Sequence, residues 1–356
     1  MATKHLDEVK NDLKRLKGLL EKLEFNAETS QTRYLLDSRI SKMFQQICIS
    51  DSLEIWRKCN APLCVVSIPH TKISELRLTN NARKMIKSIL KLALKGLSTD
   101  EHAITNMEYD NIFVEKGSDD VWVAAPIYQK WSQLKASKKV EYLKKIGSII
   151  TRLVTGGDSK VEMPKDIHML IEYFNGITGA NKFNPKVALC HPSIMCYSRM
   201  MLCAEYIYFH LMYELESMPG GMRTHTNTPQ LSGSFFLTIQ KDFGQFTYKD
   251  VKDMNDNWMC RASANPRIRY LHGLVNQLGD PVISRSLFGY LVIMKHGVKH
   301  LLDPQNKLGL ALGDTITRED ADDYLYAMYP VYMSKLVRIL IENDLLSDCW
   351  KLHGSP

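Results

Sequence analysis

The sequence has no long hydrophobic run. Its longest apolar stretches are interrupted by charged residues well before the roughly 20 positions that a membrane-spanning helix requires. The chain does not open with the basic segment and apolar core of a secretory signal. We therefore expect a soluble protein without stable membrane insertion.

The motifs of several common enzyme classes are also missing. The sequence contains no G-x-x-x-x-G-K-[ST], no G-x-S-x-G, no H-E-x-x-H and no C-x-x-C. Residues 176–182, GITGANK, have glycines and a lysine at the wrong spacing for a phosphate-binding loop. We expect no catalytic activity and no cofactor. An enzyme whose site residues are scattered along the sequence stays open as an alternative hypothesis.

Metal-binding patterns are weak. The eight cysteines lie mostly inside apolar runs, which predicts reduced, buried thiols in a cytosolic protein. One group has the residue types of a zinc site: Cys190, His191, Cys196, Cys203 and His210. Its spacing is unlike that of zinc sites. Cys196, Cys203 and His210 recur every seven residues, as they would on one face of a buried helix. We expect no metal site there. The acidic residues at 319–323 are interpreted as a solvated loop or helix start.

Acidic residues are nearly absent from residues 257–302, where Asp280 is the only one. Six basic residues occupy the same stretch: Arg261, Arg267, Arg269, Arg285, Lys295 and Lys299. Solvated helices usually alternate charge signs, so a one-signed set predicts an anionic partner. Nucleic acid is the leading candidate, since guanidinium groups bind phosphate oxygens in two-point geometry and stack on bases.

A second basic series lies upstream. Arg83, Lys87, Lys91 and Lys95 recur every four residues, opposite an expected apolar face of Met85, Ile86, Ile89, Leu90 and Leu92. Like charges at this spacing repel one another, and a phosphate backbone would relieve the repulsion. A solvated lysine face explains the pattern equally well, so both interpretations stay open. A solvated face is favoured for Lys135, Lys138, Lys139, Lys144 and Lys145.

The first 25 residues have a coiled-coil-like period. Apolar residues recur at alternating spacings of three and four: Leu6, Val9, Leu13, Leu16, Leu20 and Leu23. The pattern is too short for a confident coiled coil, so the helix must dock on something larger or pair with other helices. Two interpretations remain open, namely a helix folded on its own domain and an arm that binds a neighbouring copy.

The rest of the chain reads as mainly helical. Residues 62–70 and 121–128 are the best strand candidates, and Ser50 with Asp51 is a plausible cap for the following element. Gly156, Gly157, Pro164 and residues 176–185 predict breaks in the middle of the chain. Residues 217–230, rich in Pro, Gly, Thr and Asn, mark the expected lobe boundary. Beyond Pro304 the charge becomes predominantly acidic.

The order of features from Gln230 onward resembles the C-terminal lobe of hantavirus-type nucleocapsid proteins, the RNA-coating proteins of segmented negative-strand RNA viruses. The matching segments are LSGSFFLTIQKDF (231–243), RIRYLHGLVNQLG (267–279) and LFGYLVIMKHGVKHLLDP (287–304). Upstream, HPSIMCYSRMMLCAEYIYF (191–209) is similar to the proline-led helix of the family's N-terminal lobe. The chain is shorter than typical members and has two extra residues around Asp280 and Pro281, which indicates a divergent relative or another bunyavirus-like nucleoprotein.

The resemblance implies a helical, two-lobed core with a basic groove between the lobes and terminal arms that join neighbouring copies. We therefore expect a mainly α protein with an N-terminal arm (1–30), an N-terminal lobe (31–218), a C-terminal lobe (219–328) and a C-terminal arm (329–356). On matching positions, Arg269 and Lys295 coincide with basic residues of the family, and Arg285 does so if the two-residue insertion is accepted.

The combined functional expectation is a viral nucleoprotein. It would encapsidate single-stranded genomic RNA as a homo-oligomer, serve the viral RNA polymerase, and reside in the virion and the host cell cytoplasm. The expected RNA contacts are Arg83, Lys87, Lys91, Arg199, Arg261, Arg267, Arg269, Arg285, Lys295 and Lys299. The alternative is a non-catalytic helical scaffold or adaptor that binds protein or anionic membrane surfaces.

Overall fold

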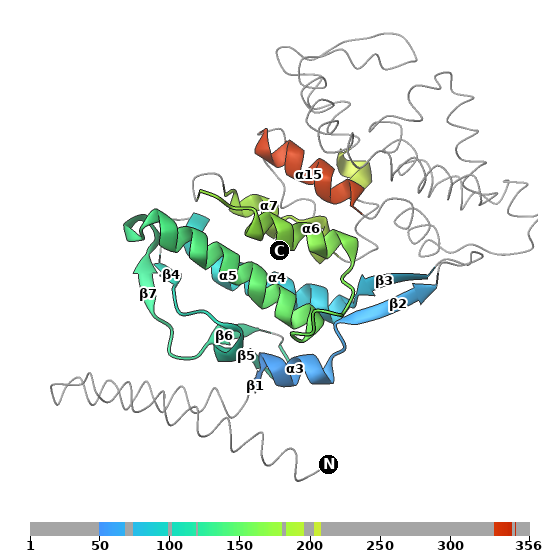
Figure 1. The fold of residues 1–356 in the computed structure, drawn as a ribbon, viewed down its shortest axis with the longest axis horizontal. Helices are drawn as coiled ribbons and strands as arrows, with labels where there is room; N and C mark the ends of the chain where they lie inside the picture. Colours follow the sequence, from blue (N-terminus) through green and yellow to red (C-terminus); the bar gives the residue numbers. More distant parts are fainter. Residues whose placement is uncertain are drawn as a thin grey trace, which may run out of the picture. The chain divides into compact units, whose positions relative to one another are not determined.

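The computed structural model describes residues 50–67, 74–98, 102–118, 120–179, 183–195, 203–207, 331–343 and 346 (Figure 1). The chain divides into two compact units. The first comprises Met1–Asn60 and Lys91–Lys135, and the second comprises Ala61–Leu90 and Ala136–Pro356. Helix α4 (Asn80–Ser98) contributes to both. The expected domain boundaries near residues 30, 218 and 328, and the N-terminal seam, lie outside the described residues.

A three-stranded antiparallel sheet forms part of the first unit. Its order is β1 (Ser50–Ser52), β5 (Ile112–Glu115) and β6 (Val121–Val123). Phe113 and Trp122 are cross-strand partners whose rings stack with centroids 4.9 Å apart. The indole of Trp122 donates to the Ser50 hydroxyl over 3.1 Å, which joins the two outer strands. Aromatic cross-strand pairs of this kind stabilise a short sheet that has few ladder hydrogen bonds.

Helix α3 (Leu53–Cys59) follows β1 and buries Leu53 and Trp56. Its N-cap is Ser52, whose hydroxyl accepts from the amide of Ile55 over 3.3 Å. The sequence predicts a cap at Ser50 and Asp51, which is wrong by one or two residues because the helix begins at Leu53, directly after Ser52. Tyr109, at the start of η1 (Tyr109–Asn111), donates to Glu54 over 3.0 Å and ties the helix to a distant turn.

A two-stranded antiparallel ribbon of β4 (His102–Ile104) and β7 (Tyr128–Lys130) lies in the same unit, followed by η2 (Trp131–Gln133). The strand predicted over 121–128 is therefore two strands, β6 and the start of β7. The break falls at Ala125, whose φ of 48° is left-handed, and at Pro126, which has no amide to donate. Asn106 stabilises the break, since its amide donates to the Ala125 carbonyl and its oxygen accepts from Ile127, each over 2.8 Å.

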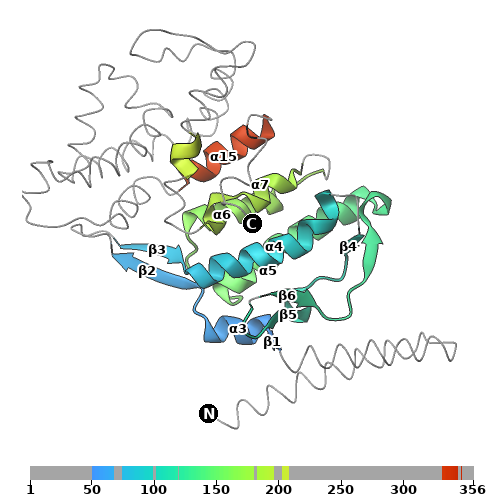
Figure 2. The ribbon, with the colours of Figure 1, turned by 180° about the vertical axis from the view of Figure 1, so that it is seen from behind.

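The second unit begins with the hairpin β2 (Leu63–Ser67) and β3 (Ser74–Leu78), which confirms the predicted strand up to Ser67. The hairpin leads directly into α4 (Figure 2). Thr79 connects the two, and its hydroxyl accepts from the amide of Ala82 over 3.3 Å. The α4 residues that are at most 1 % exposed are Ala82, Met85, Ile86, Ile89, Leu90, Ala93 and Leu94. Leu92, expected on this face, is only half-buried.

Helices α5 (Ala136–Thr155) and α6 (Lys165–Asn175) pack against each other in the second unit. Gly147 permits their close approach, because an added Cβ would lie 3.0 Å from Cβ of Phe174. Helix α5 ends at Gly156 and Gly157, whose φ values are 70° and 85°, and α6 begins after Pro164 and ends at Gly176. These breaks are those that the sequence predicts.

The described part of the second unit also contains α7 (Pro185–Leu189), η4 (Pro192–Ile194) and α15 (Tyr332–Glu342). Helix α15 packs against α7 and η4, although more than a hundred residues separate them in sequence (Figure 1). Leu336, Val337 and Leu340 on α15 are at most 1 % exposed. Apolar burial of this extent, about 1.5–3 kcal/mol for each large side chain, holds the helix in place.

Candidate nucleic acid interface

The basic residues of α4 that reach solvent are Lys84, Lys91 and Lys95, while Lys87 is half-buried. Their spacing of three or four residues aligns them along one side of the helix. Lys87 and Lys91 were predicted as RNA contacts, and their exposure is compatible with that role. Lys84, in the same NARKMIK segment, also reaches solvent and is not among the predicted contacts.

Arg83 corrects the expected four-residue series, because its side chain is only 2 % exposed. A spacing of four residues advances about 40° around a helix at each step, so three steps from Arg83 to Lys95 rotate the row by about 120°. The row therefore begins on the buried side, beside Ile86 and Leu90, and ends in solvent. The buried side chain of Arg83 is therefore not available for contact with a phosphate in this structure.

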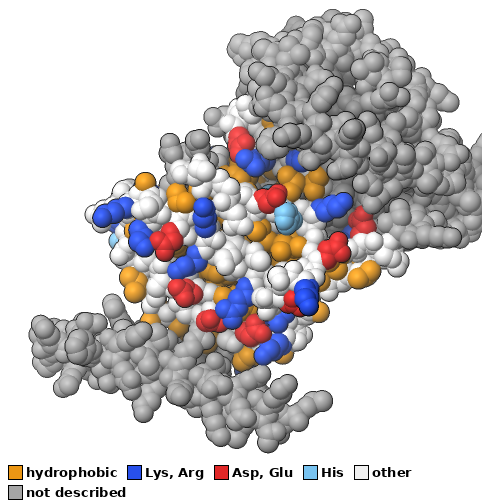
Figure 3. Space-filling model, viewed as in Figure 1, with side chains coloured by type: hydrophobic (Ala, Val, Ile, Leu, Met, Phe, Trp, Pro, Cys, Tyr) orange, Lys and Arg blue, Asp and Glu red, His pale blue; other side chains and the backbone are white. Residues whose placement is uncertain are grey.

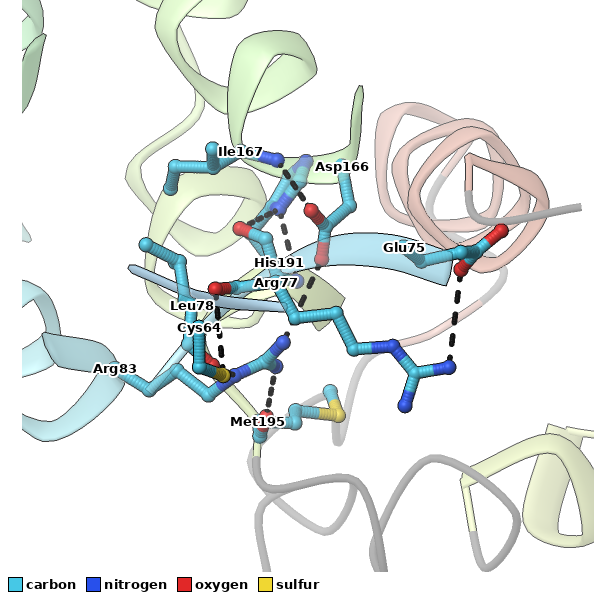
Figure 4. Close-up of polar contacts among 10 residues, drawn as sticks. Cys64, Glu75, Arg77, Leu78, Arg83, Asp166, Ile167, His191 and Met195 are labelled. Atoms are coloured by element: carbon cyan, nitrogen blue, oxygen red, sulfur yellow. Dashed lines mark hydrogen bonds and ion pairs between the residues drawn. The ribbon is translucent and has the colours of Figure 1, made fainter. Parts of the chain in front are cut away.

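The buried guanidinium of Arg83 instead connects four segments of the second unit (Figure 4). Nη1 donates to the carbonyl oxygen of Met195, and Nε donates to that of Leu78 over 3.3 Å. Nη2 lies 3.8 Å from Oδ2 of Asp166, which is fully buried on α6. The other oxygen of Asp166 accepts from the amide of Ile167 over 2.8 Å. Together the contacts join β3, α4, α6 and the end of η4.

Two further polar side chains are buried nearby and also have structural contacts (Figure 4). Arg77 is 1 % exposed, and its Nη2 lies 3.7 Å from Oε2 of Glu75. The backbone carbonyl of Arg77 accepts from the thiol of Cys64 over 3.7 Å. His191 caps η4, because its Nδ1 lies 3.2 Å from the amide of Ser193 and 2.7 Å from the Ser193 hydroxyl. These contacts stabilise the second unit and leave both side chains poorly placed for a solvent-borne ligand.

The lysines of α5 belong to a surface of mixed charge. Lys138 and Lys144 are exposed, and Lys138 forms a 2.7 Å ion pair with Glu141. The hydrogen bond and charge of Lys138 lower the pKa of Glu141. Figure 3 shows Lys and Arg side chains interspersed with Asp and Glu over the described face. This pattern is typical of a solvated surface, as the sequence indicates for this cluster.

Part of the expected C-terminal arm contacts its own chain. The guanidinium of Arg338 on α15 lies 4.9 Å from the ring centroid of Tyr173 on α6, and its Nε donates to Glu342 over 2.8 Å. Tyr173 exchanges hydrogen bonds with the backbone of Asn184, and burial raises the pKa of its phenol to about 12. An arm built from this helix would have to leave these contacts before binding another copy.

The remaining candidate residues lie outside the part of the chain that the structure describes. For RNA binding these are Arg199, Arg261, Arg267, Arg269, Arg285, Lys295 and Lys299, and for oligomerisation Leu6, Val9, Leu13, Leu16, Leu20 and Leu23. Cys196 and His210 of the metal-like group also lie outside it. The expected groove and the expected seam therefore stay predictions.

Among the described residues, no three His, Cys, Asp or Glu side chains gather closely enough to hold a metal ion. Cys190 and Cys203 are buried, and burial raises the pKa of the Cys203 thiol, whereas Cys59 is exposed. Within the same residues, no helix combines the length and apolar character needed to cross a membrane.

Comparison with known proteins adds no relative. No protein-family model matches the sequence, and no curated protein is significantly similar to it.

Proposed function

We propose that the protein is a viral nucleoprotein that coats single-stranded genomic RNA and assembles into a homo-oligomer. The observation that carries the proposal is the charge of residues 257–302, where six Arg and Lys residues occur with one acid. The order of motifs in the same region, which resembles that of hantavirus-type nucleocapsid proteins, supports it. Exposed Lys84, Lys91 and Lys95 on α4 provide further positive charge.

RNA binding of this type rests on phosphate neutralisation. Each cation that contacts a phosphate releases a condensed counterion, so affinity depends strongly on salt and weakly on base sequence. A protein that packages a whole genome needs this independence of sequence. The proposed partners are therefore single-stranded RNA, other copies of the chain and the viral RNA polymerase, in the virion and the host cell cytoplasm.

The decisive measurement is the salt dependence of binding to a single-stranded RNA of mixed sequence. A variant with Arg267, Arg269, Arg285 and Lys295 all replaced by Ala should bind less tightly and with a shallower slope. Each lost phosphate contact removes about 0.7 from the slope of log affinity against log salt for single strands. Four lost contacts therefore flatten the slope by about 2.8.

A matched control removes the same number of charges elsewhere, by replacing the α5 residues Lys138, Lys139, Lys144 and Lys145 with Ala. This α5 variant should keep nearly the wild-type slope, because these lysines belong to a surface of mixed charge. Equal salt slopes for the wild type and the fourfold variant, with folding intact, refute the assignment of these four residues as RNA contacts. Failure of the wild-type protein to bind RNA refutes the function, and binding to anionic vesicles or proteins in its place favours the scaffold alternative.

A further inference from the structure

The β4–β7 ribbon presents an aromatic ring beside two nitrogen-bearing side chains. Its register pairs His102 with Lys130 and Ile104 with Tyr128. Side chains alternate between the two faces of a strand, so these four residues share one face of the ribbon. Ile104 is 6 % exposed, whereas Tyr128 is 59 % exposed and both His102 and Lys130 are exposed.

Tyr128 is held on a fixed backbone. The amide of the preceding Ile127 donates to Asn106, and its carbonyl accepts from the amide and hydroxyl of Thr105 over 2.9 Å and 3.2 Å. No ion pair or side-chain hydrogen bond joins Tyr128, Lys130 or His102 to another described residue. The ring is therefore exposed on a backbone whose neighbouring residue is fixed, and this lowers the backbone part of the ordering cost of binding.

The charge around the ribbon favours an anionic ligand. Neither strand of the ribbon contains an acidic residue, and Lys130 and His102 lie on the same face as the ring. Asp100 and Glu101 precede β4 in sequence and lie outside the described residues. The buried centre of a protein–protein interface is usually apolar. The ring of Tyr128 is instead flanked by the polar side chains of Lys130 and His102.

We propose that Tyr128, flanked by Lys130 and His102, stacks on a base of bound single-stranded RNA. The inference rests on the proposed function and adds a contact that phosphate neutralisation does not provide. Aromatic rings bind bases of any sequence because every base has a π face. Lys130 contacts the adjacent phosphate, and His102 contributes a second charge when it is protonated.

The test compares uridine homopolymer RNA with an abasic ribose-phosphate strand of equal length, using the full chain. Tyr128→Ala should weaken binding to the base-bearing strand about tenfold, the loss expected when one stacked base is freed. It should leave affinity for the abasic strand, and the salt slope, unchanged. Tyr128→Phe should bind as the wild type does, since it keeps the ring. Ile127→Ala, a change at an exposed neighbour, serves as the matched control.

Cross-linking gives a result that does not depend on whether a variant folds. Trypsin releases residues 117–130 as one peptide that contains a single tyrosine, Tyr128. Ultraviolet irradiation of the wild-type complex with bromouridine RNA should attach nucleotide mass to this peptide at Tyr128. Cross-links confined to other peptides, or equal affinities of wild type and Tyr128→Ala for both strands, overturn the stacking contact and leave the proposed function standing. Absence of any RNA binding by the wild type overturns both.

Discussion

Arg83 and Asp166 illustrate how a charged residue becomes structural. Both are almost fully buried, and the 3.8 Å ion pair between them is supplemented by hydrogen bonds from the guanidinium to two backbone carbonyls. A buried charge without its partner is strongly destabilising, while replacing both partners with apolar residues is far less costly. The pair therefore offers a sharp test of packing in the second unit.

Asp166→Asn should lower the free energy of unfolding by about 3 kcal/mol, because it leaves the Arg83 charge buried beside a neutral group. Combining it with Arg83→Met should cost clearly less than the sum of the two single changes. Chemical denaturation of the four proteins of this double-mutant cycle provides the measurement. Strict additivity, or a loss below about 0.5 kcal/mol for the single change, contradicts the contact.

Sequence reasoning misjudged Arg83 for a definable reason. The residue type and the regular spacing both indicated a surface position, but a four-residue repeat drifts around the helix. Its partner, Asp166, lies on another helix, and no local pattern connects the two residues. Burial of a charge depends on such distant partners, so the sequence alone could not identify it.

At the scale of elements, the contact between α5 and α6 depends on Gly147. Gly147→Ala places a methyl group 3.0 Å from Cβ of Phe174 and 3.1 Å from Oδ1 of Asn175. We expect a loss of about 1–3 kcal/mol in unfolding free energy, the usual cost of overpacking. Ser148→Ala, at the next and exposed position of the same helix, should be neutral or slightly stabilising. Thermal unfolding distinguishes the two, and equal melting temperatures refute the close approach.

Helix α15 is the second element with a testable contact. Leu336 is fully buried, so Leu336→Ala should cost about 2–5 kcal/mol. Because α15 packs within its own chain, the difference in melting temperature between wild type and variant should stay the same when protein concentration rises fiftyfold. A difference that changes with concentration would instead show that the helix is supplied by another copy.

Elements bounded by local signals were predictable. The strand β2 follows an apolar run, and the breaks around α5 and α6 coincide with Gly156, Gly157, Pro164 and Gly176. Pro126 is a local signal for the split between β6 and β7, whereas Asn106, whose side chain stabilises the split, lies in a separate turn that no local pattern connects to it. The docking of α15 on α7 and η4 likewise depends on contacts between distant segments. The candidate groove residues of 257–302 remain a prediction.

At the scale of the whole molecule, we predict that residues 1–25 join neighbouring copies. Deleting residues 1–25 should shift the protein from large assemblies toward monomers, if the leucine seam binds a neighbouring copy. RNA binding should weaken without disappearing, because avidity between linked copies is lost while each copy keeps its phosphate contacts. Light scattering and RNA titration measure both effects.

Point substitutions distinguish the effect of losing the leucine seam from the effect of shortening the chain. Leu13→Asp with Leu20→Asp should reproduce the deletion, whereas Lys14→Gln with Lys17→Gln, which leaves the seam intact, should assemble normally. Unfolding or aggregation of the truncated protein would show that the helix belongs to its own core. Unaltered assembly would place the intermolecular contact elsewhere in the chain.

The path of the chain between its two units has a consequence for protein synthesis. The first unit is assembled from Met1–Asn60 and Lys91–Lys135, so all of its residues leave the ribosome while most of the second is still untranslated. The second unit must wait for α15, whose docking sites on α7 and η4 are made much earlier. During that interval α7 and η4 lack the apolar contacts that α15 provides. Slow translation after η4 should therefore increase chaperone binding and aggregation.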